Sequence, residues 1–222
     1  MRTAGVVLAA GASRRMGRLK QLLPLGGGTL LDAVLRAARA ARLDELVLVL
    51  GAEAERILAT VDTRGVRVVV AADHAEGMGA SLRTGVAALD PQVERVLVLL
   101  GDQPRVDAAL IDAVLARHRE SGRPAAAASA GGVLQPPVVA DRRLWPQLLA
   151  ARGDTGLREV LRAMPGGVAT LSVEGAAVDV DTPDDYRRLL GDPGPVSPGC
   201  EPDTPAAGGR RVCPAQAGDE ER

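Results

Sequence analysis

The sequence predicts an α/β protein with a doubly wound, mostly parallel sheet. Short uninterrupted apolar runs alternate with segments of helical periodicity, and this alternation is typical of that fold class. The 222 residues are enough for one sizeable hydrophobic core. In such sheets ligands bind beyond the carboxyl ends of the strands, so the loops that follow the strands are where function is expected.

Strand and helix alternate strictly in the first part of the chain. Each expected strand is a continuous apolar run, as in parallel strands that are covered on both faces. Thr29 stands directly before a segment with helical spacing and is a suitable N-cap. The pattern predicts strands at 4–10, 46–50, 66–71 and 96–100, helices at 30–38, 53–60 and 107–119, and a loop followed by a helix at 77–89.

The alternation changes after Gly122. Two short runs flank Gly131-Gly132 and predict a β-hairpin. Pro136-Pro137 demotes the second run to an edge strand or a partly irregular segment, because proline has no N–H to donate within a sheet. The expected elements are the hairpin at 125–130 and 133–140, helices at 142–150 and 155–163, strands at 168–173 and 176–180, and a last helix with Thr182 as N-cap and Pro183 at its first position.

Composition argues against several functional classes. A formal net charge of −1 gives no general attraction to nucleic acid, and one Trp, one Tyr and no Phe leave no set of aromatic side chains for stacking bases. No apolar run is long enough to cross a membrane, so no membrane association is expected. No signal peptide is visible either, and a cytoplasmic protein is expected.

The last segment differs in composition from the rest. Gly, Pro, Asp and Glu dominate from Gly191 onward and apolar periodicity ends, which predicts a disordered tail. The expected organisation is therefore one domain at 1–190 and a tail at 191–222. Both cysteines, Cys200 and Cys213, lie in this tail without Cys-x-x-Cys spacing, which argues against a disulfide or metal framework.

The loop after the first strand, residues 8–20, combines small residues with cations. The small residues at 9–13 allow phosphate oxygens to approach the main chain. Lys20 is the only lysine among 27 lysine and arginine residues, and its ammonium can reach between two phosphates where a planar guanidinium cannot. Chance survival of one lysine on a solvated helix is the alternative. The loop has neither the Gly-Lys-Ser/Thr ending of a P-loop nor a Gly-x-Gly-x-x-Gly pattern. Its cations are Arg14, Arg15, Arg18 and Lys20.

Asp102 directly follows the buried run 96–100 and its glycine. A charge at the end of a central strand is costly when unpaired, and a divalent cation would relieve that cost. Mg²⁺ is held by one or two carboxylates together with substrate phosphates, so Asp102 needs little help from other side chains. A turn aspartate that bonds its own backbone is the alternative.

A second carboxylate comes from Asp179 or Asp181. Alternation along a strand points both side chains the same way, and either could complete the metal site. Both are also suitable residues for the start of a helix.

Two more loops carry polar residues after expected strands. In one, glycines such as Gly79 allow close approach, and the Ser81 hydroxyl could contact a base or a phosphate, although many such junctions only turn the chain. In the other, Asp154 is by default an N-capping residue. His74 and His118 are too isolated to be given roles.

Together these segments resemble the MobA-like NTP transferases, and among them the molybdenum cofactor cytidylyltransferase (MocA-like) branch. The resemblance runs in order through residues 3–190. It is carried by 8–20 with Leu22-Leu23-Pro24 and Leu30-Leu31, Gly77-Met78 with Ser81-Leu82, Gly101-Asp102-Gln103-Pro104, Gly153-Asp154-Thr155-Gly156 with Arg158, and Asp179-Val180-Asp181-Thr182-Pro183 with Asp185.

The resemblance implies a Rossmann-like fold of the nucleotide-diphospho-sugar transferase type, with a small hairpin and helical region on the acceptor side. It implies that the loop 11–20 holds the triphosphate, that Gly79 and Ser81 lie near the base, and that Asp102 binds Mg²⁺. The opening Leu8-Ala9-Ala10-Gly11 resembles the CTP-using branch. Gln135-Pro136-Pro137 stands where the family commonly has Gly-x-Pro, which leaves the acceptor open.

The residue roles that follow are stated here as expectations. Lys20, Arg15 and Asp102 are expected to be catalytic, and Asp102 and Asp181 to hold the metal. Gln135 and Asp154 are expected to contact the acceptor. The expected nucleotide-binding residues are Leu8, Ala9, Ala10, Gly11, Ser13, Arg14, Lys20, Gly79, Ser81 and Asp102.

The expected reaction is Mg²⁺-dependent transfer of CMP from CTP to a phosphorylated acceptor, molybdopterin or the molybdenum cofactor, with release of pyrophosphate. A molybdoenzyme could then be a partner. Three alternatives remain open: an NAD(P)H-dependent oxidoreductase on the same fold, a nucleotidyltransferase for a sugar phosphate, and a non-catalytic chaperone that delivers a bound cofactor.

Overall fold

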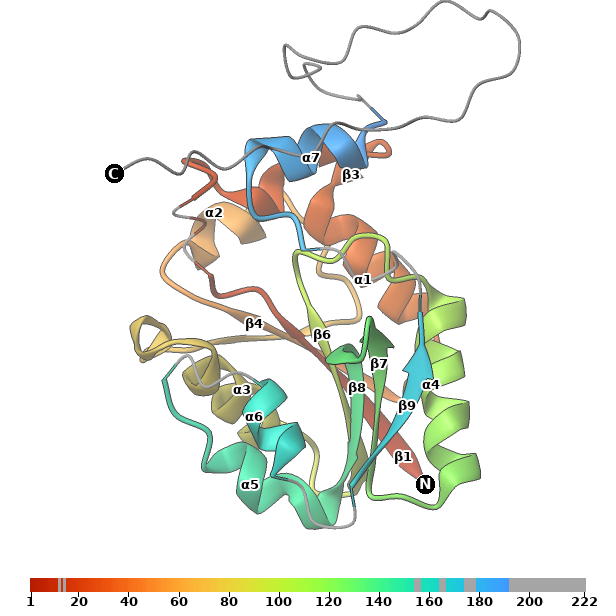
Figure 1. Cartoon of the computed structure of the whole chain (residues 1–222). Coiled ribbons are helices and arrows are strands. Elements are labelled where there is room, and N and C mark those ends of the chain that lie inside the picture. Colours follow the sequence, from red (N-terminus) through yellow and green to blue (C-terminus); the bar gives the residue numbers. More distant parts are fainter. Residues whose placement is uncertain (12, 14, 154–156, 164–166, 174–178, 192–222) are drawn as a thin grey trace, which may run out of the picture.

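The computed structural model describes residues 1–191 except 12, 14, 154–156, 164–166 and 174–178. A seven-stranded sheet runs through the molecule in the order β5-β4-β1-β6-β8-β7-β9 (Figure 1). Every neighbouring pair is parallel except the pairs that β8 makes with β6 and β7. The predicted mostly parallel α/β sheet is therefore confirmed.

The elements follow the chain as expected, with small changes at their ends. The strands of the sheet are β1 (Arg2–Leu8), β4 (Glu45–Leu50), β5 (Arg67–Val70), β6 (Val93–Leu100), β7 (Ala125–Ala130), β8 (Val133–Asp141) and β9 (Val168–Ser172), and a separate ribbon pairs β2 (Pro24–Leu25) with β3 (Gly28–Thr29). The α-helices are α1 (Leu30–Ala40), α2 (Ala54–Leu58), α3 (Met78–Ala87), α4 (Ala108–Ser121), α5 (Trp145–Leu149), α6 (Leu157–Arg162) and α7 (Pro183–Leu189).

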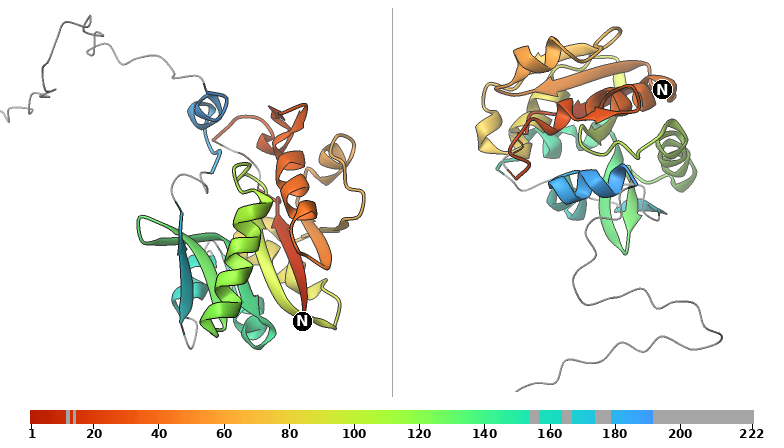
Figure 2. Two further views of the ribbon diagram at one scale, coloured as in Figure 1. Left: turned by 90° about the vertical axis from the view of Figure 1, so that its right-hand side faces the viewer. Right: turned by 90° about the horizontal axis from the view of Figure 1, so that it is seen from above.

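Helices cover both faces of the sheet, which explains the continuous apolar runs (Figure 2). On β4, Val47 and Val49 join the core under α3, α5 and α6, whereas Leu46, Leu48 and Leu50 join the core under α1, α2 and α4. Because successive side chains of a strand point to opposite faces, a strand with two buried faces must be apolar at every position.

Both threonines predicted as N-caps begin helices. Thr29 Oγ1 accepts a hydrogen bond from the Asp32 N–H, and the Asp32 carboxylate accepts one from the Thr29 N–H. Thr182 and Asp185 form the same reciprocal pair at the start of α7, with Pro183 at its first position. Such capping boxes satisfy N–H groups that have no partner inside the helix.

The second strand of the hairpin is not an edge strand. β8 lies between β6 and β7, so the expectation of an edge is wrong, whereas the expected irregularity is confirmed. The pairing of β8 with β7 jumps from Val138 opposite Ala127 to Gln135 opposite Ala128. β8 pairs with β6 only from Val138 onward, so Pro136-Pro137 falls outside both ladders and its missing N–H groups remove no ladder bond.

The strand expected at 176–180 is not formed by its described part, because Asp179 and Val180 have no strand conformation and 176–178 lie outside the described residues. Positions 192–222 of the predicted tail, with both cysteines, also lie outside them. None of the helices formed by the described residues has the length and apolar character needed to span a bilayer.

The helix α7 packs at the end of the sheet opposite to the N-terminus (Figures 1 and 2). A small third core forms there from Met16, Leu23, Leu30 and Val180, and Tyr186 packs against it. The Tyr186 hydroxyl donates a hydrogen bond to the Pro24 carbonyl oxygen at 2.6 Å. These contacts bring the end of the described chain against the segment that follows β1.

Candidate active site

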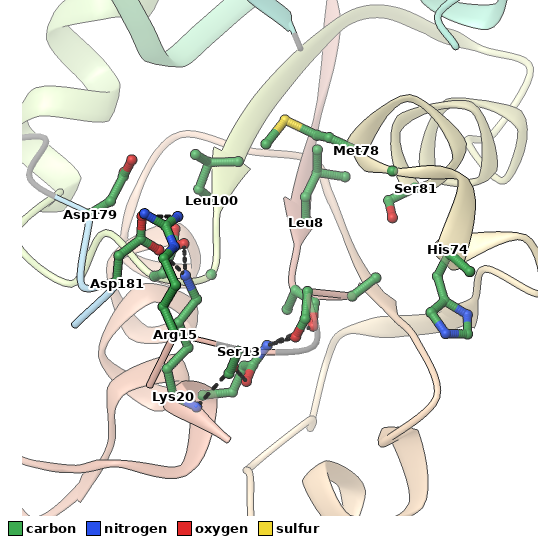
Figure 3. A pocket seen from close by; sticks show the side chains of 18 residues that line it. Leu8, Ser13, Arg15, Lys20, His74, Met78, Ser81, Leu100, Asp179 and Asp181 are labelled. Carbon is green, nitrogen blue, oxygen red and sulfur yellow. Dashed lines mark hydrogen bonds and ion pairs between the residues drawn. The ribbon is translucent and has the colours of Figure 1, made fainter. Parts of the chain in front are cut away.

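A cavity of about 600 Å³ opens beyond the carboxyl ends of β1 and β6. These two strands are parallel neighbours, so the loops that follow them meet at one edge of the sheet. Figure 3 shows Arg15, Lys20 and Asp181 at one side of the cavity and Met78, Ser81 and His74 at the other. Among the residues expected in the site, those that line it are Leu8, Ala9, Ala10, Gly11, Ser13, Arg15, Lys20, Ser81, Asp102 and Asp181.

Lys20 lies between two carboxylates. Its Nζ donates to Asp102 Oδ2 at 2.5 Å and to Asp181 Oδ1 at 2.7 Å, and its side chain is 11% exposed. Burial lowers the pKa of Lys20, but the charge and hydrogen bonds of Asp102 and Asp181 outweigh this and raise the pKa above its ordinary value. The two carboxylates therefore favour the charged form of Lys20, which lines the cavity.

Arg15 adds a second cation to the same group of charges. Its Nη2 lies 2.7 Å from Asp181 Oδ2, so both oxygens of Asp181 contact cations of the loop. The Arg15 side chain is largely exposed and its guanidinium can turn toward a ligand in the cavity.

The backbone of the loop is held by a buried glutamine that the sequence did not single out. Gln21 Nε2 donates to the carbonyl oxygens of Ala9 and Gly11 at 3.1 and 3.0 Å. Ser13 adopts φ 51° and bridges the loop, because its hydroxyl donates to Gln21 Oε1 and accepts from the Lys20 N–H. Ser13 thus shapes the loop and positions Lys20.

Asp179 is a third carboxylate at the cavity wall. Gln103 Nε2 donates to Asp179 Oδ1 at 2.7 Å, and Gln103 is buried. Burial, followed by the negative charges of Asp102 and Asp181, raises the pKa of Asp179. The expectation that Asp179 and Asp181 point the same way holds only in that both line the cavity, and without a strand to align them.

The donor set fits a divalent cation that also binds phosphate. Asp102 Oδ1 is buried and has no hydrogen-bond partner among the described residues, while Asp102 Oδ2 and Asp181 Oδ1 already converge on one cation. No cluster of three or more acidic, histidine or cysteine side chains suited to hold a metal occurs in the described part of the chain. A metal here would need ligand oxygens to complete its shell, as Mg²⁺ does with substrate phosphates.

The opposite wall is built by the start of α3. Ser81 is buried and lines the cavity, whereas Gly79 does not line it. The Gly79 N–H donates to the Gly153 carbonyl oxygen, and a Cβ at Gly79 would lie 2.9 Å from the Arg152 nitrogen. Gly79 is therefore needed for close backbone contact behind the wall.

Arg83 on α3 stabilises the same wall through hydrogen bonds to two other segments. Its guanidinium donates to the Ala151 carbonyl oxygen and to Asp73, both at 2.6 Å, and to Glu76 at 3.1 Å. The loop 73–77 and the chain after α5 are thereby joined through α3. No pattern in the sequence indicates this contact, because an arginine on a helix usually faces solvent.

His74 lines the cavity, although the sequence assigned it no role. Its Nδ1 lies 2.9 Å from the Ala71 carbonyl oxygen, and because a carbonyl can only accept, Nδ1 carries the proton.

Neither of the two residues expected to contact an acceptor is seen to line the cavity. Gln135 lies on β8 at the same end of the sheet but does not line the cavity, and its buried Nε2 has no partner among the described residues. Asp154 lies outside the described residues, as does Arg14 of the cationic loop.

Residues 5–168 match the MobA-like NTP transferase domain. Nicotine blue oxidoreductase of Paenarthrobacter nicotinovorans is 37% identical over 196 residues, which are 84% of this chain and 95% of that protein. Purine catabolism protein PucB of Bacillus subtilis is 31% identical over 196 residues, which are 83% of this chain and 94% of PucB.

Solved structures share this architecture. Rv0371c of Mycobacterium tuberculosis is similar with a TM-score of 0.77 and 35% identity, covering 86% of this chain and 98% of that one. The same protein has been solved in complex with manganese, and that structure is similar with a TM-score of 0.74 and 34% identity, covering 86% of this chain and 99% of that one.

Proposed function

Because the chain belongs to the MobA-like NTP transferase family, we propose that it moves a nucleoside monophosphate from an NTP to a phosphorylated acceptor and releases pyrophosphate. The observation that carries this proposal is the meeting of Lys20 with Asp102 and Asp181 in a cavity that the small-residue loop also lines. Such a site combines fixed positive charge, carboxylates for a metal and main-chain groups that a phosphate can approach.

CTP is the proposed donor and molybdopterin or the molybdenum cofactor the proposed acceptor. The Leu8-Ala9-Ala10-Gly11 opening, which resembles the CTP-using MocA-like branch, supports CTP. Lys20 and the loop would contact the triphosphate, and Ser81 would lie near the base. Gln135 and Asp154 are the proposed contacts to the acceptor; the buried Nε2 of Gln135 is a donor without a partner among the described residues, but it does not line the cavity. A molybdoenzyme that receives the product is the proposed partner.

The proposed chemistry is an in-line displacement at the α-phosphorus. A phosphate oxygen of the acceptor forms the new P–O bond while the bond from the α-phosphorus to the oxygen bridging the α- and β-phosphates breaks, and pyrophosphate leaves with that oxygen. Lys20 and Arg15 balance charge on the phosphates, and alignment of the two substrates contributes the rest. Asp102 and Asp181 would hold Mg²⁺, which when bound supplies positive charge to the phosphate oxygens.

The test is pyrophosphate release by the full chain with CTP, GTP, ATP or UTP, each with molybdopterin and Mg²⁺. Release is expected with CTP, and Lys20→Ala and Asp102→Asn are expected to lower it by about two to three orders of magnitude while circular dichroism shows a folded protein. Arg119→Ala, which removes an exposed cation of α4 that does not line the cavity, is the control and should keep wild-type release. Wild-type release by either site variant would refute the assignment.

An NAD(P)H-dependent oxidoreductase is the second candidate. It is favoured by the name of the relative from Paenarthrobacter nicotinovorans and opposed by the missing Gly-x-Gly-x-x-Gly pattern. The loss of NADPH absorbance in the presence of nicotine blue, without pyrophosphate release in the first assay, would establish it. Nucleotide binding without either reaction would favour a cofactor-binding chaperone.

A further inference from the structure

The two oxygens on which the proposed metal ligands Asp102 and Asp181 converge are already occupied by a cation of the protein. Asp102 Oδ2 and Asp181 Oδ1 lie 2.5 and 2.7 Å from Lys20 Nζ. The side chains of Lys20, Asp102 and Asp181 are only 11, 18 and 27% exposed, so solvent screens this contact weakly. A divalent cation on the same oxygens would lie beside the ammonium and be repelled by it.

A metal can take these two oxygens only if the ammonium moves away. The Lys20 backbone is held by the hydrogen bond from its N–H to Ser13 Oγ at 3.1 Å, whereas its side chain is a flexible stem that can carry the ammonium to another anionic partner. The loop that carries Lys20 lines the cavity, so phosphate oxygens bound there are within reach of the same side chain.

We propose that Lys20 is a resident cation that occupies the metal position until a nucleotide arrives, and thereby couples metal binding to NTP binding. The nucleotide provides both things that the exchange needs: phosphate oxygens to receive the ammonium, and the remaining ligands of the metal. Metal affinity is then low for the free protein and high for the nucleotide complex, and by linkage the metal raises nucleotide affinity by the same factor. This inference rests on the proposed function, because it assumes that the cavity takes a triphosphate.

The direct test is Mn²⁺ binding to the full chain without nucleotide, measured by the electron paramagnetic resonance signal of free Mn²⁺. The Lys20→Met variant keeps an unbranched side chain without the charge, and we expect it to bind Mn²⁺ about tenfold more tightly than the wild type. Arg15→Met is the matched control: the only ion pair of Arg15 within the described residues is with Asp181, and its side chain is exposed, so a smaller gain is expected. An unchanged or weaker Mn²⁺ affinity in Lys20→Met would overturn the proposal.

A second measurement uses the wild-type chain and so does not depend on how a variant folds. Lys20 is the only lysine, so a protein labelled with ¹³C-lysine gives a single Cε signal from this side chain. We expect CTP with Mg²⁺ to shift this signal, and the same concentration of Mg²⁺ alone to leave it in place. An equal shift with Mg²⁺ alone would contradict the proposal.

The two proposals fail in different ways. Absence of pyrophosphate release together with tighter Mn²⁺ binding by Lys20→Met would remove the transferase reaction and leave the resident cation. Pyrophosphate release by the wild type together with unchanged Mn²⁺ binding by Lys20→Met would support the transferase reaction and overturn the proposal of a resident cation.

Discussion

Asp179 differs from the other carboxylates of the cavity because no cation contacts it in the described structure. Burial first of all, then the negative charges of Asp102 and Asp181, raise the pKa of Asp179, and they outweigh the Gln103 hydrogen bond and the charge of Lys20, which lower it. A folded-state pKa above the unfolded one means that ionising Asp179 opposes folding. The penalty is absent below the ordinary pKa of an aspartate and grows as pH rises through the folded-state pKa.

Asp179→Asn is therefore expected to raise the melting temperature at about pH 8 and to leave it nearly unchanged at about pH 3. The amide oxygen of the new side chain can still accept from Gln103 Nε2, so the hydrogen bond is kept. Glu120→Gln, which neutralises an exposed carboxylate of α4, is the control and should change little at either pH. A lower melting temperature of Asp179→Asn at about pH 8 would mean that the charge stabilises the fold.

At the scale of residues, the sequence predicted the charged groups of the cavity and missed the neutral side chains that hydrogen-bond to the loop and to Asp179. Lys20 stood out because it is unique, and Asp102 because it follows a buried strand. Gln21 was not singled out, and Gln103 appeared only as part of the segment 101–104 with no role of its own, since a neutral amide in a loop has no period or charge that marks it as buried. Their importance appears only when hydrogen bonds to Gly11 and Asp179 are seen.

At the scale of elements, the start of α3 and the chain after α5 form one unit. Removing a helix glycine normally stabilises a protein by about 0.5–1 kcal/mol, because alanine has less freedom to lose. At Gly79 the new Cβ would meet backbone atoms of Ala151 and Arg152 at 2.9–3.0 Å, and backbone cannot move aside easily. Overpacking of this kind costs about 1–3 kcal/mol, which outweighs the gain.

We expect Gly79→Ala to lower the free energy of unfolding and to raise KM for the nucleotide more than it lowers kcat, because the wall that carries Ser81 is displaced and the charged residues are not. Urea denaturation and steady-state kinetics measure the two effects. Arg83→Gln removes the guanidinium that bonds α3 to the Ala151 carbonyl oxygen, introduces no clash, and should also raise KM. Arg56→Gln, which removes an exposed ion pair of α2, is the control. A more stable Gly79→Ala variant with normal KM would show that α3 and the chain after α5 are not coupled.

The sequence predicted best the elements whose formation can be inferred from the local pattern, without knowing which segments pack against them. The helix that Thr29 caps and the run that forms β4 follow from local pattern alone. The position of β8 inside the sheet does not, because it depends on pairing with β6, which is distant in sequence. Two prolines argued for an edge, and the structure accommodates them by a shift in register opposite Ala127 and Ala128.

At the scale of the whole molecule, the site joins the first strand to the end of the described chain. The loop after β1 brings Lys20, the loop after β6 brings Asp102, and the segment before α7 brings Asp181. The Val180 N–H donates to the Asp102 carbonyl oxygen, which ties that segment to the loop after β6. The sequence predicted that such loops share one edge, but the order of the strands and the packing of α7 required the structure.

Ligand binding should therefore stabilise the whole fold, in a way that depends on charge. The cavity holds three carboxylates against Lys20 and Arg15, so a triphosphate without metal meets net negative charge, and a metal without triphosphate meets the ammonium. We expect CTP with Mg²⁺ to raise the melting temperature by more than the sum of the shifts from CTP alone and Mg²⁺ alone. At a ligand concentration of about 100 Kd the gain is about 2.7 kcal/mol, or roughly 5–10 °C for a protein of this size.

The measurement is a thermal-shift panel of CTP, GTP, ATP, UTP and NADPH, each with Mg²⁺ and with a chelator. In Asp102→Asn the excess shift should disappear, because one of the two carboxylates for the metal is gone while Lys20 remains free to contact phosphate. A CTP shift that is the same with Mg²⁺ and with chelator would contradict a shared site for metal and triphosphate. A larger shift with NADPH than with any triphosphate, independent of Mg²⁺, would instead assign the cavity to a nicotinamide cofactor.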